Sequence, residues 1–372
     1  MRIGITCYSS YGGSGVVATE LGKNLSKKGH EVHFITSSVP FRLHSFEGQI
    51  YFHEVKVVTY PLFEHQPYAL NLAAKMSEVI KYNKLDVLHV HYAIPHAISA
   101  YLAKQLNGGE VKLITTLHGT DITVVGSDPA FLPVTEFGIE QSDGVTAVSR
   151  ALYDSTMKEF NITRPIEVIH NFVDTKVFKR KENQALRDKI APNGEKILVH
   201  ISNFRPVKRV DEIVKLFAGI LKEVPCKLML IGDGPERSRA EKSCRDLGIC
   251  DHTVFLGKQN AIPDYLSAAD LLVCASENES FGMTILEAMS CGVPVVAYSV
   301  GGIPEIIQDG KQGFMITNDD SSSFAESCIR ILTDSELHNS MARSGIKRAR
   351  TEFSAEVIIP KYEEYYRKII NS

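Results

Sequence analysis

Short apolar runs alternate with amphipathic stretches along most of this 372-residue chain. In the stretch after the first run, Val17, Leu21 and Leu25 recur every four residues, which places them on one face of a helix. Gly29 follows as a helix stop, and the next apolar run comes directly after it. Strands that alternate with helices favour parallel pairing through right-handed crossovers. The pattern therefore predicts an α/β fold with an open, doubly wound sheet.

The alternation occurs twice, and the chain is too long for one compact core. We expect two Rossmann-like domains, connected by a charge-rich segment at 176–196, and helix from Ser335 onward. Ligands of such sheets bind beyond the carboxyl ends of the strands, so both domains are expected to face a central cleft. The expected strands are 2–10, 32–36, 51–60, 85–92, 111–117, 144–149, 166–170, 197–201, 226–232, 253–257, 271–275 and 294–298. The expected helices are 16–28, 69–82, 95–106, 149–160, 209–223, 235–247, 282–291 and 321–333.

Composition narrows the class of protein. The formal net charge of −3 argues against a nucleic-acid binder, which would need a strongly basic surface. No run approaches the roughly 18 apolar residues of a membrane span, and the N-terminus shows no signal-peptide pattern. The seven cysteines include no C-x-x-C pair, so neither a disulfide framework nor a zinc site is expected. We expect a cytoplasmic protein with reduced cysteines in its core. Those in apolar contexts are Cys7, Cys226, Cys274 and Cys291.

Glu279 and Glu287 are separated by seven residues in the segment SENESFGMTILEAM. Eight steps of about 100° leave the two carboxylates about 80° apart around a helix, so they would not share one helix face. Glu279 is therefore expected in a loop and Glu287 inside the following helix. The amides of Ser280, Phe281 and Gly282 would open that helix, where unpaired N–H groups suit a phosphate. With carboxylates on either side to hold hydroxyls, the segment predicts a nucleotide-sugar site.

Two other strand ends carry candidate chemistry. His118 begins the sequence HGTD, where it could hydrogen-bond a sugar with Asp121 fixing its orientation, although a loop histidine can also be a solvated or capping residue. Arg205 and Lys208 occur just before a helix, where two cations are unfavourable unless an anion is bound. They could neutralise a diphosphate leaving group. The absence of an Asp-x-Asp cluster predicts that no metal ion holds this diphosphate.

Two glycine-rich turns are weaker signals. The sequence GGSG at 12–15 precedes the first helix, where backbone can approach a phosphate, but a tight turn would need the same glycines. A dinucleotide site would also need G-x-G-x-x-G spacing and an acidic residue after the second strand, where Ser37 and Ser38 stand. The sequence GDGP at 232–235 is interpreted as a structural turn, with Pro235 at the first helical position.

Taken together, the glycine loop, HGTD, the basic pair, GDGP, the E-x7-E element and the terminal helices resemble retaining glycosyltransferases of the GT-B fold, of the family 4 type. The resemblance implies that Glu279 holds sugar hydroxyls, Glu287 the ribose, and Arg205 and Lys208 the diphosphate. Most members carry an arginine where Asn203 stands here, so Arg205 is expected to take over that role. The further residues implied are Gly13 for the diphosphate, His118 for the sugar, amides near Phe281 and Gly282 for sugar or phosphate, and Gly257 and Lys258 for the base.

More narrowly, TCYSSYGGSGVVATELG, ITSSVPFRL, TTLHGTDIT and SNFRPVKRV resemble transferases that move N-acetylglucosamine from UDP-N-acetylglucosamine to L-malate in bacillithiol biosynthesis. The resemblance implies an acceptor-binding domain at 1–172, a nucleotide-sugar-binding domain at 173–355 and a terminal helix at 356–372 that crosses back to the first domain. The first domain shows no basic amphipathic helix of the kind that docks on membranes. The candidate acceptor-binding residues are Ser14, Arg42, Tyr92 and Thr116.

The expected reaction is a front-face displacement that retains configuration and needs neither a cofactor nor an enzymic nucleophile. Four alternatives stay open: transfer to another acceptor, a nucleotide-sugar epimerase, an NAD-dependent oxidoreductase, and a regulator that binds a sugar nucleotide without turnover. The sequence does not fix the oligomeric state, and a homo-oligomer is one of the states it allows.

Overall fold

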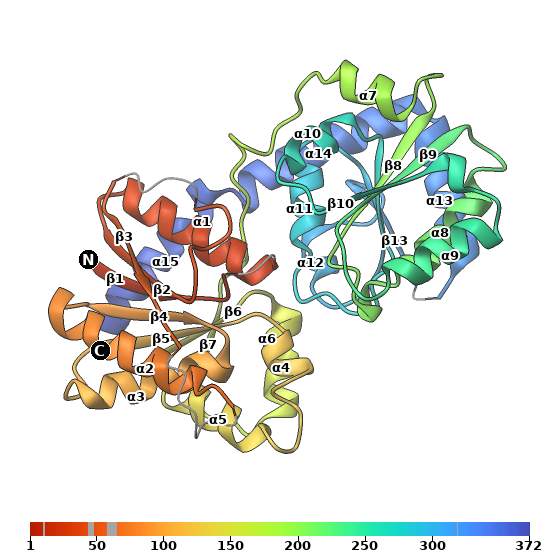
Figure 1. The fold of residues 1–372 in the computed structure, drawn as a ribbon. Coiled ribbons are helices and arrows are strands. Elements are labelled where there is room, and N and C mark those ends of the chain that lie inside the picture. Colours follow the sequence, from red (N-terminus) through yellow and green to blue (C-terminus); the bar gives the residue numbers. More distant parts are fainter. Residues whose placement is uncertain (10–11, 44–47, 58–64, 318) are drawn as a thin grey trace. The chain divides into compact units, whose positions relative to one another are not determined.

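The computed structural model describes residues 1–9, 12–43, 48–57, 65–317 and 319–372. These residues form two compact units. The first unit comprises Met1–Asn171 together with Glu356–Ser372, and the second comprises Phe172–Ala355 (Figure 1). The strands expected at 2–10 and 51–60 end earlier, at Thr6 and Glu54, and residues 10 and 58–60 of those ranges lie outside the described residues.

A parallel sheet forms the centre of the first unit. Within the described residues its strand order is β3-β2-β1-β4-β5-β6-β7, which is the doubly wound arrangement that the alternation predicts. Nearly every residue of the central strands is buried, because helices cover both faces of a parallel sheet. The strands are β1 (Arg2–Thr6), β2 (Glu31–Thr36), β3 (Ile50–Glu54), β4 (Val87–His91), β5 (Lys112–Leu117), β6 (Gly144–Ala147) and β7 (Ile166–Val168).

The helices of the first unit include two that the sequence pattern missed, α4 and α5. The predicted stripe of α1 is confirmed, since Val17, Leu21 and Leu25 are all buried. Helix α5 escaped detection because its apolar residues surround it rather than forming one stripe. The helices of this unit are α1 (Gly13–Lys27), α2 (Tyr68–Asn83), the π-helical turn η1 (Ala93–Ala97), α3 (Ile98–Leu106), α4 (Thr120–Thr123), α5 (Leu132–Glu140), α6 (Arg150–Glu159) and α15 (Ala355–Ile370).

Helix α15, at the end of the chain, packs against the first unit, as its blue ribbon among red and orange elements shows (Figure 1). Tyr366 Oη lies 2.7 Å from Nδ1 of the buried His89 on β4. Tyr365 Oη donates a hydrogen bond to the carbonyl oxygen of Val145 on β6. Glu363 pairs with Lys28 and His30 at the end of α1. Buried polar contacts therefore attach the last helix to the sheet that the first residues build.

The second unit repeats the same architecture. Its described strands pair in parallel in the order β10-β9-β8-β11-β12-β13, so the order reverses between β8 and β11 as it does between β1 and β4. The edge strand β13 is an addition to the predicted set. The strands are β8 (Lys196–Ile201), β9 (Cys226–Ile231), β10 (Thr253–Gly257), β11 (Leu271–Cys274), β12 (Val295–Tyr298) and β13 (Gly313–Ile316).

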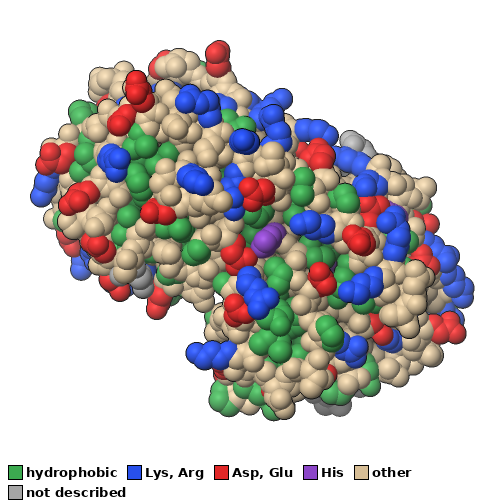
Figure 2. All heavy atoms as spheres, turned by 180° about the vertical axis from the view of Figure 1, so that it is seen from behind, with side chains coloured by type: hydrophobic (Ala, Val, Ile, Leu, Met, Phe, Trp, Pro, Cys, Tyr) green, Lys and Arg blue, Asp and Glu red, His purple; other side chains and the backbone are tan. Residues whose placement is uncertain are grey.

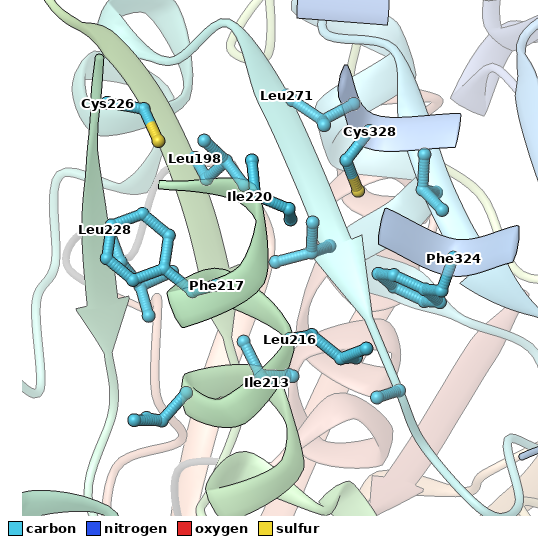
Figure 3. Packing of buried hydrophobic residues seen from close by; sticks show 14 of the residues in the cluster. Leu198, Ile213, Leu216, Phe217, Ile220, Cys226, Leu228, Leu271, Phe324 and Cys328 are labelled. Carbon is cyan, nitrogen blue, oxygen red and sulfur yellow. The ribbon is translucent and has the colours of Figure 1, made fainter. Parts of the chain in front are cut away.

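Helix α8 supplies much of the core of the second unit. Ile213, Leu216, Phe217 and Ile220 project from it towards β8, β9 and β11, and Phe324 closes the other side (Figure 3). Cys226 and Cys328 lie in this core, and their thiols are free. Cys7, Cys274 and Cys291 are likewise buried and free, as expected.

The segment at 176–196, expected as a connection, belongs to the second unit. It contains helix α7, whose Arg187 donates to a carboxylate oxygen of Asp270 at 2.8 Å and to the carbonyl of Ala268. Because these polar contacts hold the helix in place, its sequence shows no apolar periodicity from which a helix could be predicted. The helices of this unit are α7 (Gln184–Ile190), the 3-10 turn η2 (Pro206–Lys208), α8 (Val210–Ile220), α9 (Arg237–Asp246), the 3-10 turn η3 (Cys250–His252), α10 (Ile262–Ala268), α11 (Met283–Ser290), α12 (Ile303–Ile306), α13 (Ser321–Thr333) and α14 (Ser335–Glu352).

Candidate functional site

The E-x7-E element lies in a loop and a helix, as predicted. Glu279 belongs to the loop after β11, and Glu287 lies in the second turn of α11 with only 5% of the residue exposed. Gly282 caps this helix in the left-handed region, with a φ of 102° that glycine tolerates best. Phe281 is buried, so it anchors the loop next to the helix entrance. The first amides of α11 are thus presented beside Glu279.

A glycine pair after β12 shapes this loop, and sequence reasoning missed it. The amide of Gly302 donates to the carbonyl of Glu279 at 2.8 Å. A Cβ on Gly301 would lie 2.0 Å from the carbonyl oxygen of Glu279, and one on Gly302 would lie 2.5 Å from that of Ser280. Only residues without a side chain permit this approach. Two consecutive glycines soon after a predicted strand were the feature of the sequence that could have indicated this contact.

Lys208 and Glu279 form an ion pair. Lys208 Nζ lies 2.5 Å from Glu279 Oε1, and the hydroxyl of Ser276 donates to the same oxygen at 3.0 Å. Burial alone would lower the pKa of Lys208, but the charge and hydrogen bond of Glu279 outweigh it and raise the pKa. Lys208 is therefore a cation. The structure joins the residue expected at the diphosphate with the residue expected at the sugar.

The position of this pair follows from the sheet topology. Lys208 lies in the loop after β8, and Glu279 lies in the loop after β11. These neighbouring strands are the ones where the strand order reverses, which is where ligands of doubly wound sheets bind. A hydrogen bond of 2.9 Å from the Glu277 amide to the Val207 carbonyl holds the two loops together.

The basic pair lies after a strand and before a helix, as predicted. The 3-10 turn Pro206–Lys208 precedes α8, and Arg209 separates the two in a left-handed conformation with a φ of 49°. Lys208 thus lies before α8, whose first turn carries Asp211 and Glu212, the charges that a helix N-terminus favours. Arg205 begins the 3-10 turn in extended conformation and is exposed.

His200 lies near the ion pair, and it was not among the predicted residues. Its Nε2 lies 2.8 Å from the hydroxyl of Ser202, and its Nδ1 lies 3.0 Å from the carbonyl oxygen of Val273. Burial, with a smaller contribution from the charge of Lys208, lowers the pKa of His200 to about 4. A neutral imidazole therefore supports the loop that follows β8.

The GDGP turn has the structural role that was expected. A Cβ on Gly232 would lie 1.7 Å from the carbonyl oxygen of Ser202, so the turn packs tightly against the loop that leads to Lys208. The Gly232 amide donates to the carbonyl of Gly257 at 2.8 Å, beside Lys258. The expectation for Pro235 is wrong, because α9 begins at Arg237 after Glu236 as its N-cap.

In the first unit, two candidate acceptor residues meet. The hydroxyl of Ser14, in the first turn of α1, donates to Tyr92 Oη at 3.2 Å. Ser14 follows β1 and Tyr92 follows β4, so this contact lies where the first sheet reverses its order. Gly12 is the N-cap of α1, and Gly13 is its first residue. Arg42 lies beyond β2 with a φ of 71°, and its guanidinium lies 5.9 Å from the ring of Phe41.

Thr116 does not fit the acceptor role expected for it. The residue is fully buried, and its hydroxyl lies 2.7 Å from His89 Nε2 and 2.6 Å from the hydroxyl of Thr146. As a β-strand residue facing inward, Thr116 joins neighbouring strands and offers no atom to a ligand.

His118 is buried at the end of β5, and Asp121 does not orient its ring. The carboxylate of Asp121 accepts hydrogen bonds from the backbone amides of His118, Gly119 and Ala93. The ring instead meets His91, whose Nδ1 lies 2.8 Å from His118 Nε2. Asp121 therefore fixes the loop backbone, and a histidine from the neighbouring strand fixes the ring.

Four buried histidines gather around this point. Burial lowers the pKa of His89 and of His118 to about 3 and that of His96 to about 4, and it holds the pKa of His91 well below its usual value. All four imidazoles are thus neutral near pH 7. The sequence HVHY at 89–92, followed by His96, could have indicated this cluster of histidines, and sequence reasoning missed it.

Two family descriptions match the chain. "Glycosyltransferase Family 4" matches residues 11–177, and "Glycosyl transferases group 1" matches residues 181–348. The N-acetyl-alpha-D-glucosaminyl L-malate synthase of Bacillus anthracis is 50% identical over 371 residues, which cover 100% of this chain and 97% of that protein. The chain therefore belongs to the glycosyltransferase family that includes this N-acetyl-alpha-D-glucosaminyl L-malate synthase.

Solved structures agree with the glycosyltransferase fold. Sucrose-phosphate synthase from Thermosynechococcus elongatus superposes with a TM-score of 0.83 at 20% identity, covering 100% of this chain and 99% of that one. An Anabaena protein in complex with UDP and glucose gives a TM-score of 0.84 at 21% identity, covering 98% and 99%. These likenesses confirm the predicted GT-B fold.

Three observations on the described residues concern metal binding, membrane-spanning helices and surface charge. No group of three or more His, Cys, Asp or Glu side chains there is arranged to hold a metal ion. No helix among the described residues has the length and apolar character needed to cross a membrane. Acidic and basic side chains are interspersed over the face drawn in Figure 2 rather than gathered by sign.

Proposed function

We propose that this glycosyltransferase moves N-acetylglucosamine from UDP-N-acetylglucosamine to the hydroxyl of L-malate, with retention of anomeric configuration. The observation that carries the proposal is the 50% identity, over the whole chain, to the N-acetyl-alpha-D-glucosaminyl L-malate synthase of Bacillus anthracis. Residues of the second unit offer the carboxylates, amides and cations that binding of a UDP-sugar would need.

The donor residues are proposed to act from the second unit. Glu287, at the buried second turn of α11, would bind the ribose hydroxyls, with Gly257 and Lys258 beside the base. The amides of Ser280, Phe281 and Gly282 and the cations Arg205 and Lys208 would bind the diphosphate or sugar. An arriving diphosphate would compete with Glu279 for Lys208 Nζ, which would release the Glu279 carboxylate to accept hydrogen bonds from sugar hydroxyls.

Residues of the first unit are proposed to complete the reaction. Gly13, as the first residue of α1, is proposed for the diphosphate, and His118 for the sugar. Ser14, Tyr92 and Arg42 offer hydroxyls and a guanidinium to a small dicarboxylate acceptor. Thr116 is left out of this proposal because its hydroxyl is occupied inside the sheet.

The proposed step is a displacement on one face of the sugar. The malate hydroxyl oxygen forms a bond to the anomeric carbon while the bond from that carbon to the β-phosphate oxygen breaks. The departing oxygen keeps the electron pair and takes the proton of the hydroxyl. Lys208 and Arg205 would stabilise the charge that grows on this oxygen.

The test is turnover of UDP-N-acetylglucosamine with a panel of small hydroxy acids, read by mass spectrometry. A product of N-acetylglucosamine and malate, with much less product from lactate or glycerate, supports the proposal. Reaction with a different acceptor would replace malate. Conversion of the UDP-sugar to an isomer without any acceptor would show an epimerase instead.

A further inference from the structure

Two histidines meet where neighbouring strands of the first sheet end. His91 is the last residue of β4, and His118 follows β5 directly. The strands pair in parallel with His91 opposite Thr116, which brings the two imidazoles together. His91 Nδ1 lies 2.8 Å from His118 Nε2, and the ring centroids are 5.0 Å apart.

One of these nitrogens must donate and the other must accept. A neutral imidazole carries one N–H and one lone pair, so the tautomer of each ring follows from that of its neighbour. Both rings are neutral, because burial lowers the pKa of each of them. Either His91 donates through Nδ1–H, or His118 donates through Nε2–H.

The second nitrogen of His91 distinguishes the two arrangements. His91 Nε2 is buried and has no hydrogen-bond partner within the described residues. If His118 donated, His91 would carry its own proton at Nε2, as a buried N–H without an acceptor. If His91 donates, Nε2 carries only a lone pair. Proteins tolerate an unpaired buried acceptor better than an unpaired buried N–H, so the geometry favours donation by His91.

His96 holds His91 in place for this role. Its Nδ1 lies 2.6 Å from the carbonyl oxygen of His91, which can only accept, so His96 carries its proton at Nδ1. The donation fixes the backbone at the end of β4, directly beside the imidazole that faces His118.

The outer nitrogen of His118 is the atom left for a ligand. His118 is 9% exposed and its Nε2 faces His91, so Nδ1 is the ring nitrogen that His91 leaves open. We infer that His91 is a positioning residue that locks His118 in the Nδ1–H tautomer, so that the site presents a neutral hydrogen-bond donor. Its use towards a sugar oxygen rests on the proposed function, whereas the tautomer does not.

Such a donor differs from a catalytic acid. The Nδ1–H would hydrogen-bond a sugar oxygen and keep its proton throughout the reaction. With His118 in the other tautomer, the same nitrogen would present a lone pair, which repels a sugar oxygen that has no hydrogen to donate. The lock therefore selects which sugar atoms can lie against His118.

The direct test reads the tautomer in the free protein. The full chain is labelled with 15N-histidine, and the ring nitrogens are observed by long-range proton–nitrogen correlation. The His118→Ala variant identifies the signals of His118 by their loss. We expect His118 to carry its proton at Nδ1 between pH 6 and 8. A proton at Nε2 of His118 would overturn the inference.

Variants of His91 separate positioning from packing. His91→Asn keeps an N–H near the position of Nδ1, whereas His91→Leu removes it. We expect His91→Leu to give His118 mixed tautomers and to lower kcat/KM roughly 10- to 100-fold, with His91→Asn within about threefold of the parent. His33→Leu, which removes a buried histidine elsewhere in this sheet, should leave the His118 signals unchanged.

Failure of the proposed function would look different. If His118 carries its proton at Nδ1 and no sugar is transferred from UDP-N-acetylglucosamine, the inference stands and the proposed function falls. If His91→Leu leaves the His118 tautomer as in the parent, His91 does not set it, whatever the activity.

Discussion

Lys208 Nζ lies 2.5 Å from Glu279 Oε1, although the two residues follow different strands of the second sheet. The ion pair forms where the strand order reverses, and Ser276 stabilises the same carboxylate oxygen. The ion pair and the serine hydrogen bond hold both side chains at the ends of these two strands. Under the proposed function, a diphosphate would take Lys208 from Glu279, so these two side chains are the ones expected to change partners when the donor binds.

Lys208→Ala should lower kcat by roughly 10²- to 10³-fold, because charge on the leaving oxygen grows only as the glycosidic bond breaks. Steady-state kinetics with saturating acceptor measures this change. Lys215→Ala is the matched control, since Lys215 is a more exposed lysine on α8 that pairs with Asp211. If kcat stays within about threefold and only KM for the UDP-sugar rises, Lys208 merely binds the donor.

Glu287→Ala should weaken UDP binding roughly 10- to 150-fold, because a charge-assisted hydrogen bond to the ribose contributes about 1.5–3 kcal/mol. Calorimetric titration with UDP measures the affinity, and circular dichroism confirms that the variant is folded. Glu326→Ala, on the exposed side of α13, should bind UDP like the parent. Unchanged affinity in folded Glu287→Ala would remove its proposed role.

Activity should survive an excess of EDTA, since cations and helix amides rather than carboxylate pairs are proposed to hold the diphosphate. The measurement is initial rate before and after chelation, followed by addition of magnesium or manganese. Loss of turnover that either ion restores would show that a metal takes part.

Acid should destabilise the first unit through its neutral histidines. The pKa values of His89 and His118 fall to about 3 and that of His96 to about 4, against about 6.5 in an unfolded chain. Between pH 6.5 and these lower pKa values, the unfolded state binds more protons than the folded state. The folded state therefore has the full contribution of these histidines to its stability above pH 6.5 and loses it as pH falls towards 4. The expected loss is about 1.4 kcal/mol per pH unit for each histidine.

Thermal unfolding at pH 7.5, 6 and 5 measures this dependence. The His118→Asn variant should show a shallower slope, because one of the neutral histidines is then missing. Equal stability at pH 7.5 and pH 5 would contradict the assignment of neutral, buried imidazoles.

Gly302→Ala should destabilise the second unit by about 1–3 kcal/mol, because the new methyl group would lie 2.5 Å from the carbonyl oxygen of Ser280. Donor binding should weaken with it, since this contact shapes the loop that carries Glu279. Gly219→Ala is the control, because nothing lies within 4 Å of a Cβ there and alanine stabilises a helix. Denaturant unfolding of the two variants should shift in opposite directions.

The sequence by itself determined most of the elements and their order along the chain. The spacing of Val17, Leu21 and Leu25 predicted α1, and the offset between Glu279 and Glu287 placed one in a loop and one in a helix. These features follow from local periodicity, which one segment contains in full. Helices α5 and α7 escaped because one is apolar on all sides and the other is fixed by polar contacts.

Only the tertiary structure decided which side chains meet. Lys208 and Glu279 are 71 residues apart, and His91 and His118 are 27 apart. Each pair is joined by the register of neighbouring parallel strands, which no single segment encodes. The same register buried Thr116, whose polar side chain had suggested a ligand. Hydrogen-bond partners across a sheet depend on pairing between strands, and that pairing is a property of the whole fold.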